Sequence, residues 1–293
     1  MKETAVLINV KDRPTELAML LESLMFQTYQ NFDVFILDDV SGTPLTNYHF
    51  FNCIVSLLRR KKIKVYVDRT QFPHGVSKAR QSIVDWAMKG EYEYFCRVDD
   101  DVVLEPDFLQ KLINVIEQDY DISSGVTPPM GIPTFVRNPI TLKGIANRVI
   151  LDEEGNYILN ADDCGSQYTS GEILPMHHFR SSALMKREVL EKVKYLPTKL
   201  TKHGFREEQI FSYKAIMKGF KIGVDLGAIA WHQLTPSGGE RFAESNELVK
   251  INQQVLEEFT KENKDMLQEF NNFEEKDMPS KLELQKENNL LMK

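Results

Sequence analysis

Three consecutive aspartates, Asp99, Asp100 and Asp101, directly follow an apolar run at residues 92–98. Carboxylates this close repel one another, and proteins seldom gather them unless a cation neutralises the charge. In an extended segment Asp99 and Asp101 point the same way, whereas Asp100 faces the opposite side. Oxygen ligands of this kind suit a hard divalent cation, Mg²⁺ or Mn²⁺, that also binds substrate phosphates. The triplet therefore predicts a metal- and phosphate-binding centre, with a solvated acidic loop tip as the simpler alternative.

The segments that precede such carboxylates determine where they lie. Over the first 120 residues, short β-rich runs alternate with helical patterns, as in a largely parallel α/β sheet. We expect strands at residues 4–10, 32–37, 63–67 and 92–98, and helices after Pro14, Gly75 and Pro106. The pair Asp38-Asp39 ends the second strand as the triplet ends the fourth. Ligands bind beyond the carboxyl ends of strands in open α/β sheets, so both groups should converge on one crevice.

The second half of the chain has a weaker pattern. Residues 127–180 read as a long loop region with a hairpin turn at residues 152–156. Helical periodicity returns at 182–195 and 206–220, a strand-like stretch covers 222–231, and a charged amphipathic helix follows in the last fifty residues. We therefore expect one domain over residues 1–240, with halves at 1–120 and 121–240, and a helical extension over 241–293.

Composition narrows the class of protein. The 293 residues carry a formal net charge of −7, which argues against attachment to nucleic acid through a large basic surface. The one dense basic run, at residues 59–62, is typical of a solvated face. The three cysteines lack paired spacing, and no signal or membrane-spanning segment is evident. We expect a cytoplasmic protein and leave peripheral membrane contact open.

Four separated segments, within residues 4–235, together resemble the nucleotide-sugar glycosyltransferases of the GT-A fold, in particular inverting family 2. They are residues 10–41, 74–81, 99–109 and 204–232, and their order and spacing are more specific than any single motif. The resemblance implies a GT-A, Rossmann-like, mostly parallel central sheet flanked by helices. It also implies an enzyme that uses Mn²⁺ or Mg²⁺ to transfer a sugar from a nucleotide-sugar donor to an acceptor. The acceptor is left open among a glycan, a lipid carrier, a protein and a modified nucleic acid.

The resemblance assigns donor contacts to the first two segments. The aspartate at the position of Asp39 reads the nucleotide base in this family. Because an aspartate can accept the imide hydrogen of uracil or thymine, we expect a UDP-sugar. Val40 stands where the family usually has glycine, and Gln81 where it has asparagine. The further donor-binding residues that we expect are Lys11, Arg13, Lys78, Arg80, Asp99 and Asp100.

The same resemblance assigns metal and catalytic roles. Asp101 is expected to be the direct metal ligand, with Asp99 as its partner and His232 as the third ligand. Glu208 takes the place of the family's aspartate base, and Glu207 is the alternative base. We expect one of His177 and His178 to contact the acceptor, and the loop at residues 139–175 to set acceptor specificity.

Three other interpretations compete with this one. The pattern Asp99-x-Asp101-x-Val103 also matches haloacid-type phosphatases, in which the first aspartate follows the first core strand rather than the fourth. A nucleotidyltransferase uses metal-binding aspartates on a related sheet. A non-catalytic nucleotide- or carbohydrate-binding module is the alternative outside enzymology. Release of free nucleotide from a sugar donor, abolished by Asp101→Ala, would exclude the phosphatase and the binding module.

Overall fold

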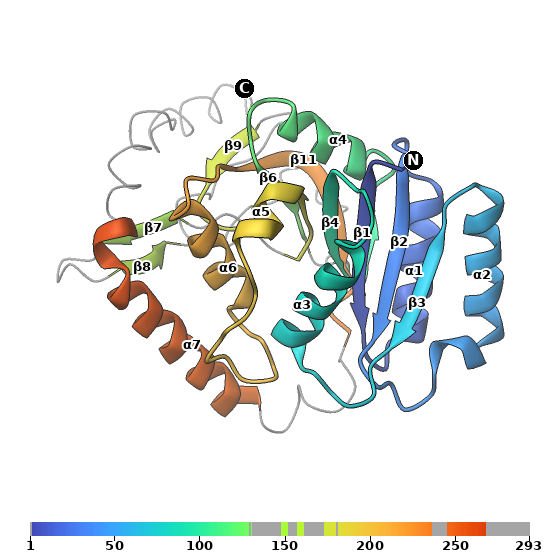
Figure 1. Cartoon of the computed structure of the whole chain (residues 1–293), viewed down its shortest axis with the longest axis horizontal. Coiled ribbons are helices and arrows are strands. Elements are labelled where there is room, and N and C mark those ends of the chain that lie inside the picture. Colours follow the sequence, from blue (N-terminus) through green and yellow to red (C-terminus); the bar gives the residue numbers. More distant parts are fainter. Residues whose placement is uncertain are drawn as a thin grey trace, which may run out of the picture.

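The computed structural model describes residues 2–128, 130, 148–151, 157–160, 173–179, 181–235 and 245–267. Within them, nine strands form one mixed, mostly parallel sheet in the order β3-β2-β1-β4-β10-β6-β11-β5, with β9 added beside β11 (Figure 1). These strands are β1 (Thr4–Val10), β2 (Phe32–Asp38), β3 (Val65–Arg69), β4 (Tyr94–Asp99), β5 (Val102–Leu104), β6 (Ile122–Val126), β9 (Ile173–Met176), β10 (Ala183–Lys186) and β11 (Ile222–His232).

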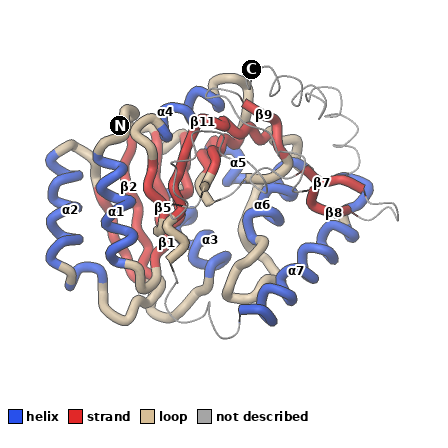
Figure 2. The backbone as a smooth tube through the Cα atoms, turned by 180° about the vertical axis from the view of Figure 1, so that it is seen from behind, coloured by secondary structure: helices blue, strands red, loops and turns tan. Residues whose placement is uncertain are grey.

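Helices cover both faces of this sheet. They are α1 (Pro14–Met25), α2 (His49–Arg60), α3 (Val76–Ala87), α4 (Phe108–Ile116), α5 (Arg187–Lys192), α6 (Glu207–Ile216) and α7 (Ser245–Glu262), and a 3₁₀ turn, η1, covers Leu45–Asn47. Alternate residues of β1 point to opposite faces, so Val6 and Ile8 pack with α1, α2 and α4, whereas Ala5 and Leu7 pack with α3 and α6. Figure 2 shows α1 and α2 side by side on their face of the sheet. The predicted α/β fold class is confirmed.

The first half of the chain follows the predicted order of elements. Strand β1 has the predicted bounds, while β3 and β4 each begin two residues later than expected. All four strands β3, β2, β1 and β4 run parallel. Their carboxyl ends therefore lie at one edge, which brings Asp39 and the acidic triplet to the same side of the sheet. Helix α2, which places Phe51, Val55 and Leu58 against the core, was not predicted.

The second half departs from expectation at one element. Residues 182–195 were expected to be helical, but Ala183–Lys186 is strand β10, and only Arg187–Lys192 is helical. The prediction was wrong because β10 pairs antiparallel with both β4 and β6, a tertiary contact that periodicity does not show. Strands β7 (Arg148–Leu151) and β8 (Tyr157–Asn160) pair antiparallel on either side of the predicted hairpin turn. The turn itself lies outside the described residues.

The C-terminal helix shares the main core. Leu256 of α7 and Leu267 just beyond it are buried in the same cluster as Ala5, Phe211 and Ile216. A helix was predicted here, but a domain boundary at residue 240 stays a prediction. No helix in the described ranges is long and apolar enough to cross a bilayer.

Val40, directly after the Asp38-Asp39 pair, has a backbone φ of 58°, in the left-handed region. A β-branched residue is strained there, whereas glycine adopts this conformation freely. We expect Val40→Gly to raise the free energy of unfolding by about 1 kcal/mol, measured by urea denaturation. Val40→Ala is the matched control, since alanine also disfavours this region. An equal gain from alanine would show that the side chain, not the backbone, carries the strain.

Candidate active site

A cavity of about 530 Å³ opens at the carboxyl ends of the parallel strands. It brings together all but three of the residues that the sequence nominated. The nominated residues that line it are Lys11, Arg13, Asp39, Arg80, Asp99, Asp100, Asp101, Glu207, Glu208 and His232. Helix α6 starts at Glu207, so both glutamates project from its first turn toward the strand ends. The carboxylates at the strand ends therefore converge as predicted. Two arginines line the same cavity, Arg13 at the N-cap of α1 and Arg80 within α3.

Arg13 neutralises two members of the acidic triplet. Its Nη1 lies 2.8 Å from an oxygen of Asp100 and 2.8 Å from an oxygen of Asp101, and its Nη2 donates to the Thr235 carbonyl at 2.7 Å. Burial, together with the charges of the neighbouring aspartates, raises the pKa of Asp100 to about 7, although Arg13 opposes the shift. Arg13 is 2% exposed, so it acts here as the internal counter-ion of the triplet. A direct donor contact from Arg13 stays a prediction.

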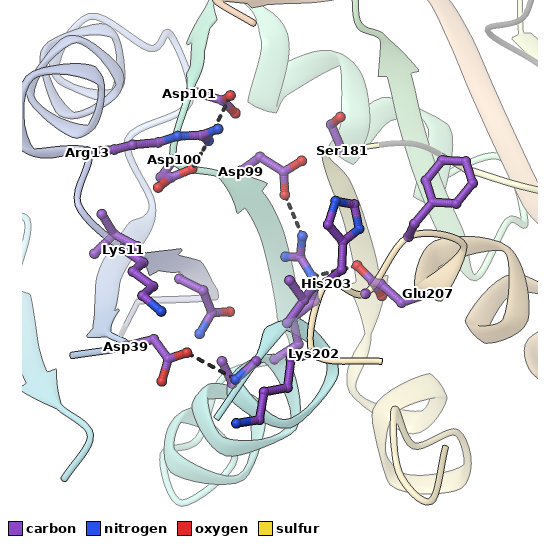
Figure 3. A pocket seen from close by; sticks show the side chains of 18 of the residues that line it. Lys11, Arg13, Asp39, Asp99, Asp100, Asp101, Ser181, Lys202, His203 and Glu207 are labelled. Carbon is purple, nitrogen blue, oxygen red and sulfur yellow. Dashed lines mark hydrogen bonds and ion pairs between the residues drawn. The ribbon is translucent and has the colours of Figure 1, made fainter. Parts of the chain in front are cut away.

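The third member of the triplet, Asp99, belongs to a separate buried ion network. Arg80 Nη2 donates to Asp99 at 2.6 Å, and Arg80 Nε lies 2.6 Å from Glu207 (Figure 3). Arg97 of β4 lies 2.8 Å from Glu207 and 3.6 Å from Asp99. Burial raises the pKa of Asp99, but the two guanidinium groups lower it by more, so this carboxylate stays ionised. Asp99 is thus oriented by arginines, and its role as a metal ligand stays a prediction.

Arg97 was not nominated, although a signal for it was present. It is the one charged residue within the run YFCRV, and a buried arginine requires a partner. Its Nη2 also donates to Glu208 at 3.0 Å, so Arg97 connects both candidate bases.

The two glutamates differ in their access to the cavity. The side chain of Glu207 is 3% exposed and lies between Arg80 and Arg97, whereas that of Glu208 is 25% exposed. An acceptor hydroxyl must come within hydrogen-bond reach of its base. Glu208 is therefore the more accessible of the two candidate bases. Glu207 instead forms buried ion pairs with Arg80 and Arg97.

The pKa of Glu207 leads to a prediction about pH and stability. Burial raises this pKa to about 7, although Arg97 and Arg80 oppose the shift. The pKa of a glutamate in the unfolded chain is about 4.3. Between this pKa and the folded-state pKa of about 7, Glu207 holds a proton in the folded state that it lacks in the unfolded state. The resulting stabilisation is complete below about pH 4 and is lost as pH rises through about 7. We expect the free energy of unfolding to fall by about 1–3 kcal/mol between pH 5 and pH 8.

Urea denaturation across this range, with EDTA present, measures the slope. Glu207→Gln removes the titrating group and should flatten the slope, while Glu208→Gln should keep it. A residual slope is expected from Asp100, because its pKa is raised in the same direction. An undiminished slope in Glu207→Gln would show that Glu207 is not the group responsible.

Two side chains offer a set of donors that fits a divalent cation. His232 Nε2 lies 3.2 Å from Asp101 Oδ1, and both residues line the cavity. Burial lowers the pKa of His232, but the hydrogen bond to Asp101 and the charge of that carboxylate raise it by more. A carboxylate and an imidazole suit Mn²⁺ and leave positions for phosphate oxygens and water. No group of three or more potential metal-binding side chains occurs in the described residues.

Asp39 caps the start of helix α3. Its Oδ1 accepts from the backbone N–H of His74 at 2.8 Å and from Thr70 Oγ1 at 3.0 Å, and its Oδ2 accepts from the Gly75 N–H at 3.1 Å. The next amide, of Val76, donates to the Lys202 carbonyl at 3.0 Å. The first amide of α3 therefore already binds a group of the protein. Asp39 still lines the cavity, and its contact with a base stays a prediction.

Three nominated residues do not line the cavity. Lys78 is exposed, and its Nζ lies 5.0 Å from the centre of the Phe72 ring. Arg80 is four residues after Val76 and shares its face of α3, whereas Lys78 is only two residues away and points elsewhere. His177 and His178 are each 3% exposed, and His178 stacks with Phe179. These placements do not support the predicted donor contact of Lys78 or the acceptor contact of the histidines.

Residues 202–205 form a cavity wall that the sequence did not nominate. Lys202, His203, Gly204 and Phe205 line the cavity, together with Ser181 and with Val249 of α7 (Figure 3). Gly204 and Phe205 open the fourth family-like segment, whereas no local pattern marks Lys202 and His203. Most of the loop that was expected to set acceptor specificity, at residues 139–175, lies outside the described residues.

Comparisons with known proteins agree with this arrangement. Residues 5–193 match the profile described as Glycosyl transferase family 2. A comparison with curated protein sequences gave no match. Among solved structures, S. aureus TarS 1-349 in complex with UDP-GlcNAc is 16% identical with a TM-score of 0.56, covering 86% of this chain and 65% of TarS 1-349.

Two further solved structures share the fold. GalNAc-T7 with UDP, GalNAc and Mn²⁺ is 16% identical with a TM-score of 0.58, and the match covers 87% of this chain and 48% of GalNAc-T7. The mannosyltransferase PcManGT from Pyrobaculum calidifontis, in complex with GDP-Man and Mn²⁺, is 14% identical with a TM-score of 0.52, with coverages of 80% and 58%. This chain therefore spans less than two thirds of the length of all three. The match leaves the phosphatase and nucleotidyltransferase interpretations without support.

Proposed function

The chain belongs to glycosyl transferase family 2, and from this we propose that it transfers a sugar from a UDP-sugar to an acceptor with inversion at the anomeric carbon. The observation that carries the proposal is the single cavity that Glu208, the acidic triplet and His232 share. A donor diphosphate needs cations and a metal site, and an acceptor hydroxyl needs an accessible base. This cavity is lined by arginines and an accessible glutamate, and by the Asp101–His232 pair that would hold a metal.

Glu208 acts as the general base in this mechanism. Its carboxylate takes the proton of the acceptor hydroxyl as that oxygen forms a bond to the anomeric carbon. The bond from that carbon to the diphosphate oxygen breaks on the opposite side, and the electron pair leaves with the nucleoside diphosphate. Attack opposite to the leaving group inverts the configuration. Arg97, which donates to Glu208, orients the carboxylate toward the cavity.

Asp101 and His232 would hold Mn²⁺ or Mg²⁺ next to the diphosphate. When bound, the metal stabilises the charge that develops on the leaving diphosphate, as a Lewis acid does. Arg13 keeps the triplet compact by pairing with Asp100 and Asp101. Arg80 and Arg97 keep Asp99 ionised and aligned on the donor side of the cavity.

The donor assignment has a separate basis. Asp39 lines the cavity, and its Oδ2, which accepts one hydrogen bond from the Gly75 N–H, retains a lone pair for the imide hydrogen of a pyrimidine base. Two solved structures of the same fold contain UDP or a UDP-sugar, and one contains GDP-Man. The acceptor stays open, and a cytoplasmic location stays a prediction.

A panel of UDP-, dTDP- and GDP-sugars tests the proposal. Purified protein with Mn²⁺ should release nucleoside diphosphate from a UDP-sugar, and EDTA should stop the release. With water as the acceptor, NMR of the released sugar should show the inverted anomer first. Binding of nucleotide without release from any donor would support the binding module instead. Thermal stabilisation by GDP alone would contradict the choice of a pyrimidine donor.

A further inference from the structure

The cavity wall at residues 202–205 belongs to the part of the chain beyond the family match, which ends at residue 193. Lys202, His203, Gly204 and Phe205 of this wall line the cavity, and Val249 of α7 lies beside them. The fourth of the family-like segments begins at Gly204, but neither the family match nor that segment assigns a role to Lys202. The proposed mechanism gives no role to Lys202 or to the wall.

One side of the wall is packed tightly against the start of α3. Gly75 has a φ of 75°, and a Cβ added there would lie 2.8 Å from the Lys202 Cα. Gly204 has a φ of 69°, and a Cβ added there would lie 2.4 Å from the Val76 Cβ. The Lys202 carbonyl accepts the Val76 N–H at 3.0 Å. Only glycine fits at both points of approach, so the backbone of Lys202 is fixed next to the loop that Asp39 caps.

The other side of the wall is held by α7. Asn252 is fully buried, and its Oδ1 accepts the Thr201 N–H at 2.8 Å. One residue further along α7, Gln253 accepts from Arg206 Nε at 2.8 Å. These two hydrogen bonds bracket residues 202–205. The C-terminal helix therefore fixes both ends of the wall, although it lies about fifty residues away in sequence.

The charge of Lys202 has no counter-ion in the described part of the chain. Arg13 and Arg80, the cavity's two arginines, are each paired with two carboxylates, whereas Lys202 makes no ion pair there. Figure 3 shows Lys11, Asp39 and Lys202 toward one end of the cavity and Asp101 toward the other. Lys202 lines the cavity with an exposed side chain, and an ammonium group that has no carboxylate partner in the described residues is suited to a phosphate oxygen of a ligand.

We propose that Lys202 binds the α-phosphate of the nucleotide donor, which is the phosphate nearer the Asp39 end of the cavity, and that Asn252 of α7 is the positioning residue that holds Lys202 in place. The identity of the anion rests on the proposed function. The contact itself rests on the geometry of the wall and on the unpaired ammonium. Through Asn252, helix α7 then helps to form the donor site.

Calorimetric titration of UDP in the presence of Mn²⁺ tests the contact without requiring turnover. Lys202→Ala should weaken UDP binding by about 10- to 100-fold, as expected for loss of a charge-assisted hydrogen bond. Lys202→Arg keeps the charge and should restore most of the affinity. Lys199→Ala is the matched control, since Lys199 is three residues away, pairs with Glu258 and Glu262, and does not line the cavity. Uridine, which lacks phosphates, should bind Lys202→Ala and wild type equally.

Asn252→Ala tests the positioning role. It should reproduce most of the Lys202→Ala loss, and the double variant should lose little more. Leu256→Ala, at a buried core residue of the same helix that does not line the cavity, should lower the melting temperature but keep UDP affinity. Equal losses in Asn252→Ala and Leu256→Ala would overturn the positioning role.

An unchanged UDP affinity in Lys202→Ala, or an equal loss for uridine, would overturn the phosphate contact. Wild-type protein that binds UDP through Lys202 but releases no nucleotide from any sugar donor would overturn the proposed function alone. Wild-type protein that binds no nucleoside diphosphate would overturn both.

Discussion

Replacement of Glu208 by glutamine is expected to reduce nucleotide release from the donor by about 10²–10⁴-fold, the usual contribution of a general base. Glutamine keeps the size of the side chain and can still accept the hydrogen bond from Arg97, but it cannot take a proton. The loss should therefore appear in kcat, while the KM for the donor changes little. Steady-state kinetics over a range of UDP-sugar concentrations measures both.

Two variants show whether the loss is specific to this carboxylate. Glu208→Asp retains a base but withdraws it by one methylene, and we expect a loss of about 10²-fold from the misplacement. Glu207→Gln leaves the accessible carboxylate in place and should reduce turnover less than Glu208→Gln does. If Glu207→Gln caused the larger loss in kcat while remaining folded, the base would be Glu207. The greater exposure of the Glu208 side chain would then not identify the base.

The elements that local sequence determines were predicted well. Residues 4–10 and 32–37 are mostly apolar runs, as expected for strands covered on both faces, and β1 and β2 lie there. The carboxylates at their ends follow from the direction of a parallel sheet. The position of Arg80 on the cavity side of α3 also follows from helical spacing, since it lies four residues after Val76.

Features that depend on distant contacts could not be predicted in this way. Strand β10 is only four residues long and exists because β4 and β6 lie on either side of it. Lys202 enters the cavity because Asn252 and Gly75 fix its loop, and neither is close in sequence. The pairing of Arg13 with the triplet also spans 87 residues. The sequence motif indicates that Arg13 belongs to the site. Only the tertiary contacts show that it pairs with Asp100 and Asp101.

The helix α2 is a different case, because its signal is local. Phe51, Val55 and Leu58 recur at the spacing of a helical face and all three are buried. The neighbouring Asn52 and Ser56 interrupt the apolar pattern, yet they lie on the exposed side of the helix. Counting matches to a helical template over residues 49–60 would have found this element.

Asp101→Asn is expected to reduce nucleotide release by about 10²–10⁴-fold, because the metal contributes several kcal/mol to stabilisation of the leaving diphosphate. Asparagine has nearly the same shape but lacks the charge that a divalent cation requires from its ligand. Arg13 remains paired with Asp100 in the variant, so the fold should survive the change. The loss should be accompanied by a large increase in the Mn²⁺ concentration needed for half-maximal activity.

Asp100→Asn is the matched control for this variant. It removes the other carboxylate that pairs with Arg13, but Asp100 does not contact His232, whereas Asp101 lies 3.2 Å from it. We therefore expect Asp100→Asn to lower the melting temperature while its Mn²⁺ requirement stays close to that of the wild type. If both variants shifted the Mn²⁺ requirement equally, the metal would be held by the triplet as a whole. If neither shifted it, the cation would not bind at the Asp101–His232 pair, and the arginines Arg13, Arg80 and Arg97 would have to stabilise the leaving diphosphate instead.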